Sequence, residues 1–167
     1  MYLTRDIEVG KDYLKSMYAA METKRFGAIA SSQANYLKSH KLDVSFNDRR
    51  SVHYPAWFNS PPSSGISCCD FTSVATEFEC QGLELDMPLI CWARDLLWNG
   101  TQWNHSGRTS VGIQDPRQLT LNAYRVLLTR GKDGFVIFLP NHTLAKTTYS
   151  ILKRAGVQDI PSIAKQL

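Results

Sequence analysis

The sequence predicts an α/β fold whose sheet is mainly parallel. Short apolar runs alternate with amphipathic helical segments along the 167 residues, and this alternation is typical of strand–helix–strand units. One run, "GFVIFLP" at 134–140, is apolar almost throughout, as expected of a parallel strand that is covered on both faces. The length suits a single domain, residues 1–167, with a substantial core.

The first half of the chain begins with helical periodicity and then loses it. Leu14, Met17, Tyr18 and Met21 recur at the spacing of one helix face. Over residues 42–66, turn residues and aromatics replace any period, which predicts an irregular excursion on the surface. The elements predicted before it are a helix over 12–24, a strand over 25–31 and a helix over 32–40 with Ser31 or Ser32 as N-cap.

The second half carries clearer turn signals. An Asn-Gly pair between aromatic-containing runs predicts a β-hairpin over 96–103. Asp115 and Pro116 suit the N-cap and first position of a helix that closes on Gly131. The other predicted elements are strands over 73–76, 88–93 and 134–140 and a final helix over 143–156, capped by Thr143 and Gly156.

Composition and charge narrow the class of protein. A net charge of +4 and a pI near 8.9 permit a polyanionic partner without requiring one. No apolar run approaches the ~20 residues of a membrane-spanning helix, and the charged N-terminus does not resemble a signal peptide. The four cysteines include no C-x-x-C pair, so they predict reduced, mostly buried thiols in a cytoplasmic protein with no metal site.

Two segments carry motif-like wording: "TEFECQGLELD" at 76–86 and "YRVLLTRG" at 124–131. Together they resemble the fifth and sixth motifs of superfamily 1 helicases, which read Thr-x-His-x-x-Lys-Gly-Leu-Glu and a leucine-rich helix ending in Thr-Arg-Ala. The strand and Ser-Ser helix start in "RFGAIASSQANYL" are similar to the fourth motif. The wording looks closest to a bacterial DNA/RNA helicase family described as a domain of unknown function, and it is also similar to Schlafen-type helicase domains. The resemblance covers roughly residues 24 to 155.

The resemblance implies a three-layer RecA-like fold of the P-loop NTPase type, the second of two lobes that bind ATP between them. Arg130 would be the arginine finger, whose fixed cation stabilises charge that spreads over the transferred phosphoryl group. Glu84 would accept hydrogen bonds from the ribose hydroxyls, and Gly82 would let the backbone approach the nucleotide. Thr76 and Gln81 would bond to a nucleic-acid phosphate or couple it to the nucleotide.

Other roles for the same residues stay open. An arginine in the last turn of a helix often only interacts with the free carbonyls and the helix dipole. Arg125 lies five residues before Arg130 and therefore on another helix face, which favours a structural role, although a second phosphate contact is the alternative. Phe78 and Gln81 stand where the fifth motif has His and Lys, which puts the contacts of that segment in doubt.

Two sequence features of the first lobe are missing from the chain. It has no G-x-x-x-x-G-K-[ST] phosphate-binding loop and no Asp-Glu pair. We therefore expect the second motor lobe of a longer ATP-dependent helicase or translocase. Its partners would be the N-terminal RecA-like lobe and single-stranded DNA or RNA. ATP with Mg²⁺ would be held mainly by that first lobe, and no nucleotide or ATPase activity is expected of the chain alone. The alternative is a non-catalytic module that binds nucleic acid or protein.

Aromatic residues near basic residues suggest base stacking. Trp57 and Trp98 are the candidates, because exposed rings beside cations such as Arg49 and Arg50 can stack on single-stranded bases. Alternatively, these rings pack the excursion onto the sheet.

Overall fold

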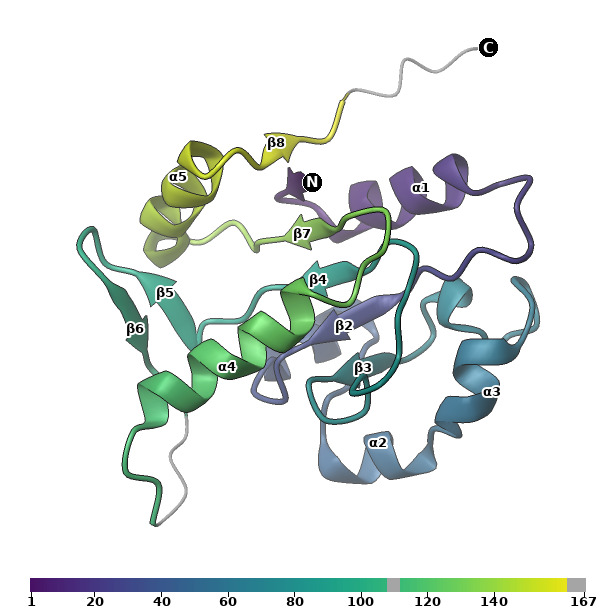
Figure 1. The fold of residues 1–167 in the computed structure, drawn as a ribbon, viewed down its shortest axis with the longest axis horizontal. Coiled ribbons are helices and arrows are strands. Elements are labelled where there is room, and N and C mark those ends of the chain that lie inside the picture. The colour runs from purple at the N-terminus through teal and green to yellow at the C-terminus, as the bar shows by residue number, and fades with distance from the viewer. Residues whose placement is uncertain (108–111, 162–167) are drawn as a thin grey trace.

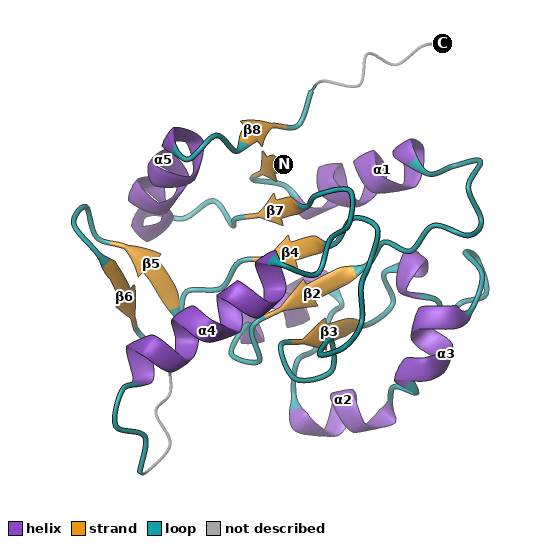
Figure 2. Ribbon diagram, viewed as in Figure 1, coloured by secondary structure: helices purple, strands orange, loops and turns teal. Residues whose placement is uncertain are grey.

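The computed structural model describes residues 1–107 and 112–161, which form one parallel six-stranded sheet with helices around it (Figure 1). The strands lie in the order β3-β2-β4-β7-β1-β8, and a separate antiparallel hairpin pairs β5 with β6 (Figure 2). The predicted α/β class, the parallel sheet and the hairpin are therefore confirmed. The strands of the sheet are β1 (Tyr2–Thr4), β2 (Ala28–Ala30), β3 (Val74–Thr76), β4 (Leu89–Cys91), β7 (Val136–Phe138) and β8 (Gln158–Asp159), and those of the hairpin are β5 (Leu96–Trp98) and β6 (Trp103–His105).

The central strands are short and completely buried, which explains their uniformly apolar sequences. Ala30 lies opposite both Thr76 and Cys91, and Cys91 lies opposite Phe138. The carboxyl ends of four strands therefore align, and we call this side the carboxyl edge and the opposite side the amino edge. Every residue of β2, β3, β4 and β7 is buried. Figure 1 shows α4 crossing in front of the sheet, with α2 and α3 beside β3.

The helices are α1 (Ile7–Met17), α2 (Phe46–Ser51), α3 (Tyr54–Asn59), α4 (Pro116–Leu128) and α5 (Lys146–Arg154), with 3-10 helices η1 (Asn35–His40), η2 (Cys68–Asp70) and η3 (Thr143–Ala145). The prediction for α4 is confirmed at its start, because Asp115 accepts a hydrogen bond from the amide of Gln118 at 2.9 Å. Its end differs, since Thr129 is the C-cap and Gly131 has no left-handed backbone. Gly131 instead lies against Gly134 and Pro88, so close packing requires the glycine.

The first helix was misplaced by the sequence prediction. It begins at Ile7, because Asp6 caps it by accepting a hydrogen bond from the amide of Glu8. It ends at Met17, so the predicted span 12–24 covers only its second half and the turns that follow. The strand β1, which precedes this cap, was not predicted.

The region 32–66 also differs from prediction. The helix expected over 32–40 is the 3-10 helix η1, and neither Ser31 nor Ser32 caps it, because η1 begins only at Asn35 with Ala34 in the N-cap position. The two serine hydroxyls donate instead to the carboxylates of Asp95 and Glu77. The excursion 42–66 is not irregular throughout. It contains α2 and α3, capped by the side chains of Ser45 and His53.

The C-terminal segment differs in detail. Thr143 begins η3 and caps no helix, and α5 starts only at Lys146. Gly156 does follow the helix with a left-handed backbone, φ +94°, as a stop signal requires. All four cysteines are free and buried, as predicted. No helix within residues 1–107 and 112–161 has the length and apolar character to span a membrane.

Candidate functional site

Three of the residues predicted from the fifth and sixth motifs meet in a shallow hollow of about 270 Å³. Arg130, Gly82 and Glu84 line it, although some 46 residues of chain separate the two segments. Lys132, which the sequence prediction did not include, lines the same hollow. We call this place the arginine hollow.

Backbone pairing brings the two segments together. The amide of Leu85 donates to the carbonyl of Arg130 at 2.8 Å, and the amide of Lys132 donates to the carbonyl of Leu85 at 2.9 Å. This parallel bridge extends the pairing of β4 and β7 beyond their first residues. The arginine hollow therefore lies at the amino edge.

Arg130 does not lie at the carboxyl edge, where parallel α/β sheets usually bind their ligands. A helix that connects two parallel strands runs antiparallel to them, so its last residues return to the edge where the next strand begins. Arg130 follows α4 and precedes β7, and it is therefore at the amino edge.

The guanidinium of Arg130 is held by oxygen acceptors that carry no formal charge. Its Nε donates to the carbonyl of Val126 at 3.1 Å, and its two terminal nitrogens donate to the carbonyl of Leu83 at 3.4 Å and to Oγ1 of Thr129 at 3.2 Å. A guanidinium has five N–H groups, so two have no partner among the residues that the structure describes. No carboxylate within the described part of the chain forms an ion pair with Arg130. The result is a fixed, half-buried cation without a counter-charge.

The rest of the arginine hollow is open to solvent. Glu84 is exposed, and its carboxylate lies 3.9 Å from Nζ of Lys132, a contact that contributes little at the surface. Gly82 has φ +80°, and nothing lies within 4 Å of where a Cβ would stand. The glycine therefore serves the left-handed backbone of the turn and leaves free space above it.

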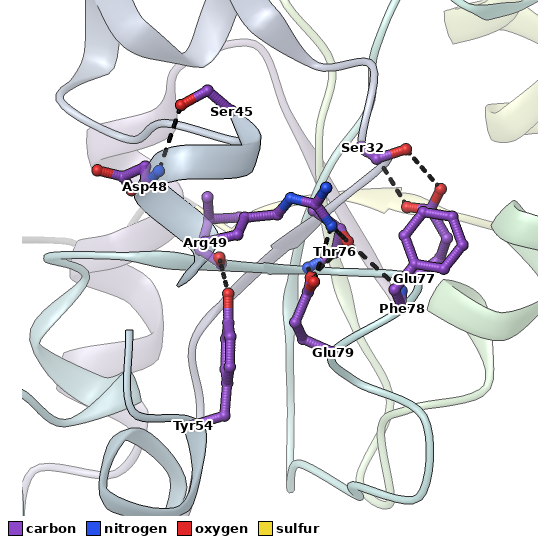
Figure 3. Close-up of polar contacts among 10 residues, drawn as sticks. Ser32, Ser45, Asp48, Arg49, Tyr54, Thr76, Glu77, Phe78 and Glu79 are labelled. Carbon is purple, nitrogen blue, oxygen red and sulfur yellow. Dashed lines mark hydrogen bonds and ion pairs between the residues drawn. The ribbon is translucent and has the colours of Figure 1, made fainter. Parts of the chain in front are cut away.

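The carboxyl edge holds the second group of motif residues, and Thr76 is its centre. Its side chain is completely buried, and its hydroxyl and amide both donate to Oε2 of Glu79. Arg49, from α2, completes the network by donating to Oε1 of Glu79 at 2.7 Å and to Oγ1 of Thr76 at 3.4 Å (Figure 3). In this arrangement Thr76 has no surface for a direct phosphate contact. The sequence prediction named Arg49 only as a cation near aromatic rings, and its contact with Thr76 was not predicted because the segment 42–66 was interpreted as irregular. The helix-start signal Ser45-x-x-Asp48 precedes Arg49.

Beside this network a ring is exposed. Phe78 has an exposed fraction of 59%, and the guanidinium of Arg49 lies 5.8 Å from its ring centroid. Figure 3 shows Phe78 and Glu77 next to Ser32. Glu77 accepts hydrogen bonds from both the amide and the hydroxyl of Ser32 at 2.8 Å, and burial raises the pKa of its carboxyl group above its usual value.

A second hollow, of about 310 Å³, opens at this edge between β2, β3 and α4. Gln81 and Phe78 are part of its wall, so Gln81 faces a different hollow from its neighbour Gly82. Deeper in the same wall, the buried carboxylate of Asp95 accepts hydrogen bonds from Ser31 at 2.6 Å and from Tyr124 at 2.8 Å. Tyr124 belongs to α4, so this contact ties the carboxyl edge to the helix that leads to Arg130.

The remaining predicted residues lie elsewhere. Trp57 is buried in the core, with an exposed fraction of 2%, so the prediction that its ring stacks on bases is wrong. Arg125 is exposed and donates to Asn122 at 2.9 Å, outside the arginine hollow. Trp98 is half-buried on the hairpin, outside both hollows, and its ring packs against Trp103. No group of three or more potential metal ligands is found among the described residues.

Comparison with known proteins adds one finding. A family model described as the Schlafen group 3 DNA/RNA helicase domain matches residues 1–141. No curated protein matches the chain.

Proposed function

The chain belongs to the Schlafen group 3 DNA/RNA helicase domain family, and from this premise we propose that it acts as the second RecA-like lobe of an ATP-dependent helicase or translocase. In this role Arg130 is the arginine finger. The partner is a first RecA-like lobe that carries the phosphate-binding loop, which this sequence lacks.

The observation that carries the proposal is the uncompensated cation in the arginine hollow. Arg130 has two free N–H donors and no carboxylate partner in the described ranges, and it shares its hollow with Gly82 and Glu84. The bonds to Val126 and Thr129 are those of an arginine at its own helix end, whereas the bond to Leu83 and the shared hollow go beyond that role. Carbonyl acceptors hold the guanidinium in place, so little side-chain entropy is lost when an anion binds.

These residues suit one side of a nucleoside triphosphate. Arg130 would contact the anionic oxygens of the phosphates. A fixed cation stabilises the charge that spreads over them most effectively in a site shielded from water. Glu84 has free carboxylate oxygens for hydroxyl donors, and Lys132 adds a second cation beside them. Mg²⁺ would be held by the first lobe, because the hollow offers only the single carboxylate of Glu84.

The carboxyl edge supports a nucleic-acid role on the other side of the lobe. The exposed ring of Phe78, backed by Arg49, offers a face for a base. Thr76 would act indirectly, by fixing the turn that joins this edge to Gly82 through its bonds to Glu79. A strand of DNA or RNA and the nucleotide would therefore contact opposite edges of one sheet.

A non-catalytic binding module remains the second candidate, and one observation favours it. Phe78 and Gln81 replace the His and Lys of the fifth motif, so the segment between the two hollows lacks two groups that the motif normally supplies. Such a module would bind nucleic acid or protein without using nucleotide.

The test is Arg130→Ala in the full-length parent protein, assayed for ATP hydrolysis in the presence of single-stranded DNA or RNA. We expect kcat to fall by about 10³-fold to 10⁵-fold, the range measured for arginine fingers. Arg125→Ala is a matched control on the same helix, because it removes an equal charge outside the arginine hollow. Its kcat should stay within about twofold of wild type, because Arg125 is exposed and its side chain bonds to Asn122, outside the arginine hollow, in the part of the chain that the structure describes.

Two results would contradict the proposal. Unchanged hydrolysis in Arg130→Ala would favour the non-catalytic module. Robust hydrolysis by the 167-residue chain alone would show that it needs no first lobe.

A further inference from the structure

A groove of about 280 Å³ lies between the β5–β6 hairpin and α5, away from both hollows. We call it the hairpin groove. It is lined by Trp98, Gly100, Lys146, Ser150, Ile151 and Arg154, together with Thr147. The helix α5 lies beyond residue 141, where the match to the family model ends.

Two cations and no acid line the hairpin groove. Lys146, Ser150 and Arg154 are spaced four residues apart, so they form one stripe along α5. Both Lys146 and Arg154 are exposed, and neither forms an ion pair with any residue that the structure describes. The next cation on the helix, Lys153, instead pairs with Asp159 at 2.8 Å outside the groove. The free positive charge of α5 is therefore concentrated on the groove side.

The aromatic wall of the groove is held rigidly. The amide of Trp98 donates to Oγ1 of Thr148 at 2.9 Å, and the hydroxyl of Thr147 donates to the carbonyl of Trp98. The ring of Trp98 also packs edge-on against Trp103, with 5.5 Å between centroids. Because both backbone and ring are fixed by neighbours, stacking a planar group on Trp98 costs little additional ordering.

From the fixed ring and the row of unpaired cations we infer that the hairpin groove is a binding site for single-stranded nucleic acid. A base stacks on Trp98, and the adjoining phosphates contact Lys146 and Arg154. Ser150 offers a hydroxyl donor between the two cations. This inference rests on the nucleic-acid role proposed above, and it adds a contact surface that neither motif hollow includes.

An aromatic chain connects the groove to the sheet. Trp103 contacts Trp92 with 5.5 Å between centroids, and Trp92 contacts Tyr124 of α4 at 4.4 Å. A strand bound at the groove would therefore rest on a continuous packed layer that reaches the helix ending near Arg130.

The test measures binding of the 167-residue chain to fluorescently labelled oligothymidylate and oligouridylate, without nucleotide, across a series of salt concentrations. We expect Trp98→Ala to weaken binding by about 5-fold to 140-fold, which corresponds to the loss of one stacked base. Trp98→Phe should recover most of the affinity, because a flat ring remains. The double variant Lys146→Gln/Arg154→Gln should reduce the slope of log K against log salt by about 1.4, the value for two phosphate contacts to a single strand.

Two controls establish whether the hairpin groove itself binds the oligonucleotide through base stacking. Lys153→Gln removes a charge from the same helix outside the groove, and it should leave the salt slope unchanged. Polyglutamate of matched charge tests for a general anion surface. If Trp98→Ala leaves oligonucleotide binding unchanged, or affects polyglutamate equally, base stacking at Trp98 is refuted.

The outcomes also distinguish this inference from the proposed function. If all groove variants bind the oligonucleotide with wild-type affinity, the hairpin groove is not the binding site, and the proposed roles of Arg130 and Phe78 are unaffected. Absence of any oligonucleotide binding by the folded wild-type chain would overturn both the groove and the nucleic-acid part of the proposed function. Circular dichroism of each variant verifies that it is folded.

Discussion

Gly131→Ala would introduce the residue that the sixth helicase motif normally has after its arginine, and we nevertheless expect it to destabilise this protein. A Cβ at Gly131 would lie 1.9 Å from the carbonyl oxygen of Gly134 and 2.7 Å from Cδ of Pro88. The carbonyl oxygen of Gly134 belongs to the backbone, so it cannot move aside as the end of a flexible side chain can. The turn from Gly131 to Gly134 would have to shift by roughly 1 Å or more to relieve the overlap.

The size of the effect follows from what this turn holds. The amides of Lys132 and Asp133 donate to the carbonyls of Leu85 and Asp86 at 2.9 Å and 2.8 Å. Weakening two such hydrogen bonds costs about 1 kcal/mol each, and overpacking adds about 1–3 kcal/mol. Replacing glycine returns about 0.4–1 kcal/mol by restricting the unfolded chain. We expect the free energy of unfolding to fall by about 2–4.6 kcal/mol, and the melting temperature to fall by about 4–18 °C for a domain of this size.

The assay is urea and thermal unfolding of the wild-type chain and the variant under identical conditions. Lys132→Ala, the adjacent substitution at an exposed side chain, is the control and should change stability by no more than about 0.5 kcal/mol. An unchanged or increased stability of Gly131→Ala would refute the close packing of the two segments, and with it the geometry of the arginine hollow.

Two further predictions concern the carboxyl edge. Arg49→Leu leaves the largely buried carboxylate of Glu79 without its ion-pair partner, so the free energy of unfolding should fall by about 1–3 kcal/mol. The double variant Arg49→Leu/Glu79→Leu should recover part of that loss in urea unfolding. Equal losses in the single and double variants would argue against the ion pair. Glu77 has a raised pKa in the folded state, so the folded chain binds its proton more tightly than the unfolded chain does. Its contribution to stability should therefore decrease as pH rises from the usual carboxyl value of 4.5 through the raised pKa, and remain constant above it. Melting temperatures of wild type relative to Glu77→Gln between about pH 4 and pH 8 measure this difference, and a constant difference across the range would rule out the raised pKa.

The sequence by itself determined the class of fold, and it identified three motif residues that the structure then brings together in one hollow. Apolar runs such as 134–140 bury the side chains of both faces only in a sheet that is covered on both sides. Capping residues such as Asp115 bond to the backbone of their own helix. These signals are local, so they can be interpreted without knowing where the rest of the chain lies. The motif wording likewise selected Gly82, Glu84 and Arg130, which share one hollow.

Only the tertiary structure decided which side chains are exposed and which distant residues contact each other. Whether an aromatic ring is on the surface depends on what packs over it, and this is why Trp57 is buried while Phe78 is exposed. Thr76 and Arg49 are 27 residues apart, and only the fold makes them neighbours. The edge at which Arg130 lies follows from the direction of α4 relative to the strands, and the need for glycine at Gly131 follows from a backbone approach three residues on. Contacts between distant segments arise from packing the whole chain, and no local pattern records them.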